Sequence, residues 1–317
     1  MPPIAPRLAL AASQGFGDLD DGWPLLQTAL VAAGFDPQVA VWEDPAVDWG
    51  SFDLVAVNYA WGYVTRHRDF LEWTARVATE TRLVNPQEVL AWNSEKTYLA
   101  DLADDGIPIV PTSWVPPGGV WTPPSDDYVI KPSVASGSLG AARYRRTGIE
   151  TAKEHVRRLH RQGQTVMVQP YQPAIDAHGE VALIYFDGRY SHAVSKQALL
   201  EPDVGEIDRL WERHVITPAE ASDRQRSLAE TTLAAVTSRV GSTAYARVDV
   251  IDDFDGHPVV LEVELIEPAF YLTHGVDAPE RFADVLRRWA EYIPRRRHQW
   301  KRRRSGGTAG GNPPAGR

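Results

Sequence analysis

The sequence of 317 residues contains no cysteine, which excludes disulfide bonds and thiolate catalysis and suits a reducing cytoplasm. It also contains no apolar run that approaches the roughly 18 residues needed to span a bilayer, so we expect no membrane segment. The N-terminal stretch MPPIAPRLALAAS has only a short apolar part and no basic beginning. It therefore predicts entry into a first strand and not a secretory signal peptide.

Basic residues are scarce outside the C-terminal tail. Eight of the 33 Lys and Arg residues fall within positions 295–317, where there is no Asp or Glu, which leaves 25 against all 42 acidic residues in the rest of the chain. Such an acidic body is a poor surface for nucleic acid. The tail could bind a polyanion, but its Gly-, Pro- and Asn-rich half cannot bury a core, and we expect it to be disordered.

A chain of this length predicts about two domains, and its first 92 residues have the pattern of a small α/β unit. Apolar residues at helical spacing follow Trp23, and a second helical pattern covers 69–80. Short apolar strand patterns occupy 37–42 and 52–59. Helices and strands that alternate in this way predict a parallel sheet with helices on both faces.

The pattern changes after this unit. A helix is predicted to start at an N-cap formed by Asn93 or Ser94, and a proline-rich, extended stretch follows it. From Tyr128 onward strands and hairpins dominate. The pair Asp187-Gly188, between two strand patterns, is a strong signal for a two-residue hairpin turn.

A second hairpin, over residues 245–265, carries charge on one face only. Side chains alternate between the two faces of a strand, so each strand of this hairpin has one apolar and one charged side. A turn centred near Asp255 and Gly256 would place Arg247 opposite Glu264 and Asp249 opposite Glu262. A one-residue bulge in one strand would break this pairing.

Three carboxylates on one sheet face repel one another unless a cation lies among them. Hard oxygen ligands on a rigid sheet suit Mg²⁺, which keeps some waters and shares its coordination shell with substrate phosphates. Arg247 beside them can hold an anion through two parallel N–H groups. The alternative is an ordinary solvated face on an amphipathic hairpin.

A lysine beside a loop of small residues marks a second candidate site. Lys131 ends a strand pattern in YVIKPSVASGSLGAARY, and the loop after it is rich in Ser and Gly. Successive backbone amides in such a loop form an anion-binding nest, and glycines let the main chain approach closely. The spacing is neither that of a P-loop nor that of G-x-G-x-x-G. A flexible linker is the alternative.

Several of these features occur in an order that is typical of one enzyme family: Lys96, Lys131, the Ser/Gly loop, VQPYQ, Glu180, Lys196 and the charged hairpin. This order resembles the ATP-grasp superfamily, to which D-alanine–D-alanine ligase and glutathione synthetase belong. The resemblance implies a mixed α/β and α+β protein, an ATP-grasp fold with an N-terminal Rossmann-like pre-ATP-grasp domain. The implied parts are 1–92 for that domain, 93–172 for the central subdomain with the phosphate loop, 173–294 for the C-terminal subdomain with the metal site, and 295–317 for the tail.

The resemblance also implies roles for the residues at matching positions. The implied ATP contacts are Lys96, Lys131, Ser136, Gly137, Ser138, Gln169, Tyr171, Gln172, Glu180 and Lys196. The implied ligands of Mg²⁺, or of Mn²⁺ in its place, are Asp249, Glu262 and Glu264. Arg247 and Lys196 are implied to stabilise the phosphoryl group in transfer. Lys96 could instead be a surface lysine, and Glu180 and Lys196 an ordinary cross-strand pair.

The implied reaction is ATP-dependent formation of an amide or peptide bond. ATP phosphorylates a carboxylate and an amine attacks the acyl phosphate, which requires positioning and charge neutralisation more than a covalent nucleophile. Amino acids or other small carboxylates and amines of secondary metabolism, such as antibiotic biosynthesis, are the implied substrates. Ring closure of the cycloserine-synthetase type, modification of a protein terminus and a nucleotide-binding regulator without turnover remain alternatives. The oligomeric state is open, a homodimer included.

Two stretches are candidates for the substrate pocket. One follows the strand at 52–59, where open α/β sheets bind ligands, and the other follows the charged hairpin. The candidate residues are Tyr59, Trp61, Tyr63, Arg66, Glu267 and Tyr271. Aromatic packing and an arginine at a helix start are the alternative for the first stretch. His67, His192 and His274 are candidate bases that spacing does not separate.

Overall fold

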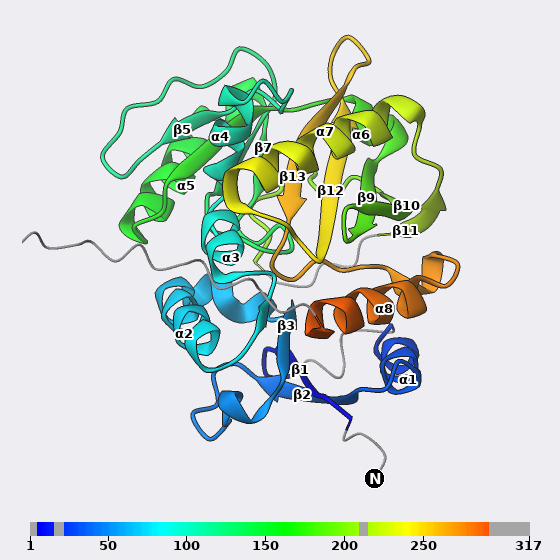
Figure 1. Cartoon of the computed structure of the whole chain (residues 1–317). Helices are drawn as coiled ribbons and strands as arrows, with labels where there is room; N and C mark the ends of the chain where they lie inside the picture. Colours follow the sequence, from blue (N-terminus) through cyan, green and yellow to red (C-terminus); the bar gives the residue numbers. More distant parts are fainter. Residues whose placement is uncertain (1–4, 16–21, 209–214, 292–317) are drawn as a thin grey trace, which may run out of the picture.

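A computed structural model of the chain describes residues 5–15, 22–208 and 215–291. Within these ranges the chain forms three β-sheets, one in the N-terminal part and two in the remainder (Figure 1). None of the helices in these ranges combines the length and hydropathy that crossing a bilayer requires. The basic tail lies outside the described residues, and its expected disorder stays a prediction.

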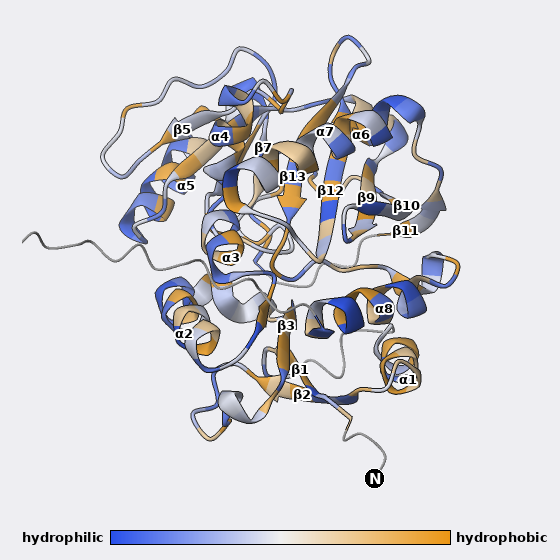
Figure 2. Ribbon diagram, in the orientation of Figure 1, coloured by the Kyte–Doolittle hydropathy of each residue, from blue (hydrophilic) through white to orange (hydrophobic). Residues whose placement is uncertain are grey.

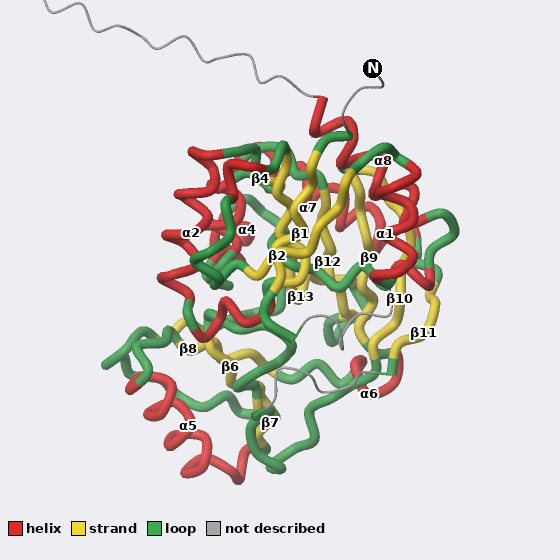
Figure 3. The backbone as a smooth tube through the Cα atoms, turned by 90° about the horizontal axis from the view of Figure 1, so that it is seen from below, coloured by secondary structure: helices red, strands yellow, loops and turns green. Residues whose placement is uncertain are grey.

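The N-terminal sheet is parallel and has the strand order β2-β1-β3-β4. Its strands are β1 (Arg7–Ala12), β2 (Asp36–Val41), β3 (Leu54–Tyr59) and β4 (Leu83–Val84). Figure 3 shows helix α2 (His67–Glu80) on one side of this sheet and α1 (Trp23–Ala32) on the other. The strands between them are largely apolar, and β3 is orange in Figure 2. The predicted parallel sheet with helices on both faces is confirmed.

The C-terminal sheet is antiparallel, with the order β11-β10-β9-β12-β13. Its strands are β9 (Glu180–Phe186), β10 (Arg189–Lys196), β11 (Ile216–Ala219), β12 (Tyr245–Asp252) and β13 (Pro258–Glu264). Both predicted hairpins are present. Asp187 and Gly188 have φ angles of 52° and 71°, as a two-residue turn of this kind requires. Helices α7 (Asp223–Val240) and α4 (Tyr98–Asp104) pack on its apolar face.

The central sheet is also antiparallel, with the order β5-β8-β6-β7. Its strands are β5 (Ser113–Val115), β6 (Tyr128–Pro132), β7 (Ala142–Tyr144) and β8 (Val166–Pro170). Helix α5 (Ile149–Arg161) covers one face of this sheet. The other face, which carries Lys131 and Gln169, borders a cavity that the charged face of the C-terminal sheet also borders.

The last helix, α8 (Ala278–Glu291), returns to the N-terminal sheet and lies beside α1 (Figure 1). One apolar core therefore joins the two ends of the chain. It includes Leu8 and Leu10 of β1, Phe186 of β9 and Phe282 of α8.

The predicted helix start at Asn93 or Ser94 is wrong. Helix α3 (Gln87–Asn93) ends at Asn93, and α4 begins only at Tyr98. The Asn93 side chain donates to the carbonyl of Val263 and accepts from the amide of Leu265, both at 2.8 Å. It therefore fixes the end of α3 to β13 and does not cap the next helix.

Candidate active site

A cavity of about 660 Å³ lies where the three sheets meet. The central sheet contributes Lys131 and Gln169, the C-terminal sheet contributes its charged face, and the N-terminal sheet contributes Asn58 and Tyr59. The charged side chains that border the cavity are Lys96, Lys131, Glu180, Lys196, Arg247, Glu262 and Glu264, together with His274. Opposite charges are thus concentrated in one enclosed space.

The cross-strand register of the charged hairpin is the predicted one. Arg247 pairs with Glu264 and Asp249 with Glu262. A bulge does occur, but it lies between Asp249 and Val250, on the turn side of both charged pairs. The charged side chains therefore stay on one face of the sheet.

Both carboxylate oxygens of Asp249 accept hydrogen bonds from cationic side chains. Its Oδ1 accepts from Nε of Arg247 at 2.8 Å, and its Oδ2 accepts from Nη2 of Arg247 and Nζ of Lys196, each at 2.8 Å. Burial alone would raise its pKa, but the two cations hold the pKa well below its usual range. Lys196 also forms an ion pair with Glu180, its direct cross-strand partner. Glu180 and Lys196 thus form the cross-strand pair considered above, and both border the cavity.

The two remaining carboxylates are each paired with one cation. Glu262 forms an ion pair with Lys96, and Glu264 accepts from Nη2 of Arg247 at 2.5 Å. Lys96 is not a surface residue: it is 9% exposed and also donates to the carbonyl of Ala135 at 2.8 Å. Burial raises the pKa of Glu264 to about 7. A small change in the surrounding charge can therefore change its protonation near neutral pH.

Lys131 has no ion pair among the described residues. Burial lowers its pKa from 10.5 to about 8. The loop that follows has left-handed backbone at Gly137, Ser138 and Gly140, with φ of 57°, 65° and 74°. Residues 135–139 of this loop border the cavity beside Lys131. An unpaired cation and a loop of this conformation are suited to bind an anion.

Two of the three predicted carboxylate ligands on the charged face are placed to bind a magnesium ion in the cavity, and the third is not. Glu262 and Glu264 border the cavity and offer the carboxylate oxygens that Mg²⁺ prefers. Asp249 does not border it, and both of its oxygens accept from Arg247 or Lys196. Asp249 could contact an ion only after one of these cations had moved to another anion, such as a phosphate.

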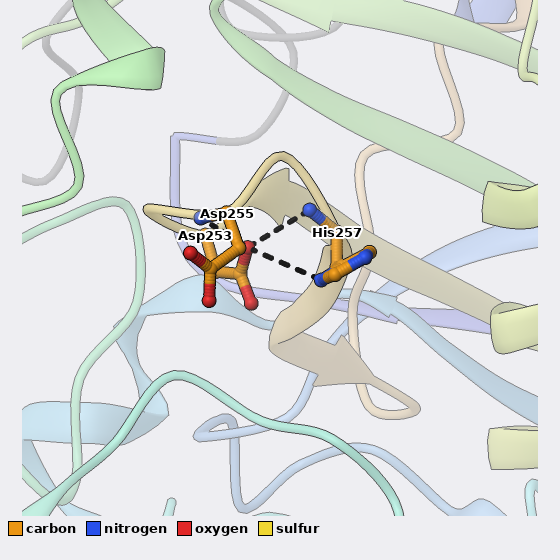
Figure 4. Close-up of side chains that lie close together, drawn as sticks. All are labelled: Asp253, Asp255 and His257. Carbon is orange, nitrogen blue, oxygen red and sulfur yellow. Dashed lines mark hydrogen bonds and ion pairs between the residues drawn. The ribbon is translucent and has the colours of Figure 1, made fainter.

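Another group of possible metal ligands lies at the tip of the same hairpin. Figure 4 shows Asp253, Asp255 and His257 close together on the turn. Oδ1 of Asp253 accepts from the backbone amides of Asp255 and His257 at 2.9 and 2.8 Å. These bonds stabilise the turn, and the group does not border the cavity.

The predicted base-binding residues divide into two groups. Gln169 and Tyr171 border the cavity, and Nε2 of Gln169 donates to the hydroxyl of Thr112 at 2.8 Å. Gln172 stays a prediction: its side chain is 2% exposed and is not among the residues that border the cavity. Gln172 directs its Nε2 to the carbonyl of Pro170 at 3.4 Å.

Of the predicted substrate residues, Tyr59, Trp61 and Tyr271 border the cavity. Tyr63 and Glu267 border a small adjacent pocket, beside Lys96 and Glu262. Burial raises the pKa of Glu267 to about 8.

The prediction for Arg66 is wrong. Its side chain is 49% exposed, pairs with Asp69 at 2.7 Å and borders neither pocket. The alternative of an arginine at a helix start is the correct one, since Arg66 directly precedes α2. Among the three histidines considered as bases, His274 borders the cavity, while His192 bonds the carbonyl of Phe270 and His67 bonds Ser94.

Sequence reasoning did not find several parts of the cavity wall. Two of them are the segment 198–200, which follows β10, and Asn58. Asn58 had a usable signal, because it is a polar residue inside the otherwise apolar strand pattern LVAVNY. The segment 198–200 had none, since its place depends on contacts with the central sheet.

Known proteins resemble this chain in sequence and in fold. The family model for the N-terminal domain of D-cycloserine synthetase DcsG matches residues 8–85. The chain is 37% identical over 297 residues to the cycloserine biosynthesis protein DcsG of Streptomyces lavendulae, which covers 88% of this chain and 97% of that protein. The crystal structure of D-cycloserine synthetase DcsG has a TM-score of 0.82 at 35% identity, covering 90% of this chain and 99% of that one.

Two more distant structures share the fold alone. D-alanine–D-alanine ligase from Bacillus anthracis, solved with ATP, has a TM-score of 0.62 at 13% identity and covers 90% of this chain and 98% of its own. The ATP-grasp ligase PsnB, solved with a minimal precursor, Mg and ADP, has a TM-score of 0.56 at 16% identity with the same coverage.

Proposed function

The chain belongs to the family of the cycloserine biosynthesis protein DcsG and is an ATP-dependent ligase of the ATP-grasp fold, and from this premise we propose that it activates the carboxylate of a small, amino-acid-like substrate and joins it to a nitrogen. The observation that carries the proposal is the cavity where four cationic side chains and three carboxylates come together. A glycine-containing loop and the aromatic and amide side chains Tyr59, Tyr171 and Gln169 border the same cavity.

We infer a division of roles among the residues of the cavity. Lys131 and the amides of the loop would bind the phosphates of ATP, while Gln169 and Tyr171 would contact the base. Glu262 and Glu264 would hold Mg²⁺, with Asp249 joining them once Lys196 bonds a phosphate. When bound, the ion would neutralise charge between the phosphates.

The proposed reaction has two steps. A carboxylate oxygen of the substrate attacks the γ-phosphorus, the bond to ADP breaks, and an acyl phosphate forms. A nitrogen then attacks the acyl carbon, phosphate leaves, and the nitrogen loses a proton. Arg247 would bond the transferring group, because it borders the cavity beside Glu264, to which it also donates a hydrogen bond.

A second candidate function is intramolecular ring closure on the same site. It is supported by the identity to the D-cycloserine synthetase DcsG, whose name states a cyclic product. The mass of the product distinguishes the two candidates. Ligation joins two substrates with loss of water, whereas ring closure converts a single substrate.

The test is ADP release with Mg²⁺, ATP and pooled amino acids, followed by mass spectrometry of the product. We expect Glu262→Gln to lower turnover by about 100-fold or more, because it removes a charge from the proposed metal site. Asp255→Asn is the matched control on the exposed turn of the same hairpin and should leave turnover unchanged. If Glu262→Gln had normal turnover, or if Asp255→Asn had the larger effect, the proposed metal site would be wrong.

A further inference from the structure

Asn58 is the residue at which β3 departs from regular pairing. Ala11 of β1 pairs with Val57, but the next residue, Ala12, pairs with Tyr59. Asn58 is therefore an extra residue, a bulge, in a strand that otherwise runs in register. Bulges redirect side chains and often lie beside functional sites. Here Tyr59, the residue after the bulge, packs in the core shared with α1.

The position of this bulge is where open α/β sheets bind ligands. The chain leaves β1 for β2 on one side and later returns to β3 on the other side of β1. Ligands bind outside the carboxyl ends of the two strands at such a point. Asn58 lies at the carboxyl end of β3 and borders the cavity together with Tyr59 and Gly22.

The amide of Asn58 makes only one of its hydrogen bonds. Its Nδ2 donates to the carbonyl of Pro268 at 3.3 Å, whereas its buried Oδ1 has no partner among the described residues, although the residue is 1% exposed. The Pro268 carbonyl fixes the orientation of the Asn58 amide, because turning the amide over would place its Oδ1, an acceptor, against the carbonyl oxygen of Pro268, another acceptor. A buried acceptor without a donor costs free energy that a donor on a ligand can recover.

We propose that Oδ1 of Asn58 accepts a hydrogen bond from the ammonium group of the substrate, so that the enzyme selects substrates that carry a free amine. The proposal rests on the proposed function, since it concerns the substrate of that same site. A carbonyl oxygen only accepts, which excludes a substrate carboxylate as its partner.

The test compares two ligands that differ in the amine alone. The probes are D-cycloserine and isoxazolidin-3-one, the same ring without its amino group, each titrated calorimetrically into the full chain with Mg²⁺ and ADP. We expect the wild-type protein to bind D-cycloserine more tightly by about tenfold. Asn58→Leu, which has a similar volume and no acceptor, should bring the ratio of the two affinities close to one.

Two further variants separate recognition of the amine from positioning of the loop that holds Pro268. Asn58→Asp keeps an acceptor but loses the bond to Pro268, and it should retain the preference for the amine. Trp61→Phe removes the bond from Nε1 of Trp61 to the carbonyl of Glu267 on the same loop, at 3.0 Å. It should weaken both ligands by the same factor and leave their ratio unchanged.

The proposal is overturned if wild-type protein binds the two probes equally or binds neither of them. It is also overturned if Asn58→Leu keeps the wild-type ratio. Failure of the proposed function would have a different signature, namely no binding of ADP with Mg²⁺ and no ADP release by the wild-type protein.

Discussion

Lys131 differs from the other cations of the cavity in having no anionic partner within the described residues. Lys96, Lys196 and Arg247 are each paired with a carboxylate. Burial without a partner disfavours the charged form, which explains why the pKa of Lys131 falls to about 8. A triphosphate would supply the missing anion and raise this pKa again.

ATP binding should therefore weaken above pH 8. The free protein loses the charge of Lys131 as the pH rises through its pKa, whereas the ATP complex favours the charged form. We expect kcat/KM for ATP to fall by up to about tenfold per pH unit above that pKa. The measurement is steady-state kinetics between about pH 7 and pH 10.

Lys131→Arg is the control for this pH dependence, since arginine keeps its charge throughout the range. The decline should be absent in this variant, and the same decline in both proteins would contradict the assignment.

The contribution of Lys131 to the stability of the fold changes with pH in the opposite direction. Because the folded pKa lies below the unfolded value of 10.5, the unfolded chain binds more protons between about pH 8 and 10.5, so this group's contribution to stability rises with pH there.

Individual site residues could be predicted where the signal was local. The period of two in the charged hairpin places Arg247 and Asp249 on one face of β12, and the structure has them there. The prediction for Arg66 failed because a neighbouring residue determines its direction: Asp69 holds Arg66 at the surface. Asn58 is visible in the sequence as a polar residue in an apolar strand pattern, but its bulge depends on register with β1, which no local pattern contains.

At the scale of elements, the loop after β6 is held in place by a distant segment. The amide of Gly140 donates to the carbonyl of Ile207 at 2.8 Å, and the amide of Ile207 donates to the carbonyl of Ala141 at 3.0 Å. The segment that contains Ile207 also provides cavity residues 198–200. The loop conformation is thus part of the cavity wall.

Gly140→Ala should weaken ATP binding. The φ of 74° disfavours any residue with a Cβ, and the added Cβ would lie 3.3 Å from Cδ of Pro132. We expect KM for ATP to rise by about tenfold as the loop shifts. Gly163→Ala is the matched control, with a φ of 77° but no atom within 4 Å of the added Cβ. Equal KM values for ATP in the two variants would show that the loop conformation does not matter for the nucleotide.

Elements defined by turns were easier to predict than those defined by tertiary contacts. The turn at Asp187-Gly188 requires positive φ angles that its residue types favour, so its hairpin follows from the sequence. The boundary between α3 and α4 does not, because Asn93 is a good N-cap residue that β13 binds instead. A tertiary contact here replaces the local preference.

At the scale of the whole molecule, one apolar core joins the N-terminal sheet to the C-terminal sheet, and an aromatic cluster around Phe282 lies in it. The ring of Phe282 on α8 stacks on that of Phe186 on β9, with centroids 5.2 Å apart. It also meets Phe270, at 4.7 Å, and Tyr245 of β12, at 5.8 Å. Phe270 in turn borders the cavity. The cluster therefore links the stability of the whole chain to the shape of the cavity where Phe270 borders it.

Phe282→Ala should lower the free energy of unfolding by about 3–5 kcal/mol, because it empties a fully buried position. Since the same cluster joins both ends of the chain, we expect fluorescence and circular dichroism to report one shifted transition in denaturant titrations. Phe254→Ala is the control: this ring is 65% exposed, and its loss should change stability by less than about 0.5 kcal/mol. Two separated transitions, of which only one responds to Phe282→Ala, would mean that the two sheets fold independently.

The same variant, Phe282→Ala, should raise the KM for the substrate but not the KM for ATP. Phe270 loses its support in this variant, whereas Lys131 and its loop lie on the central sheet.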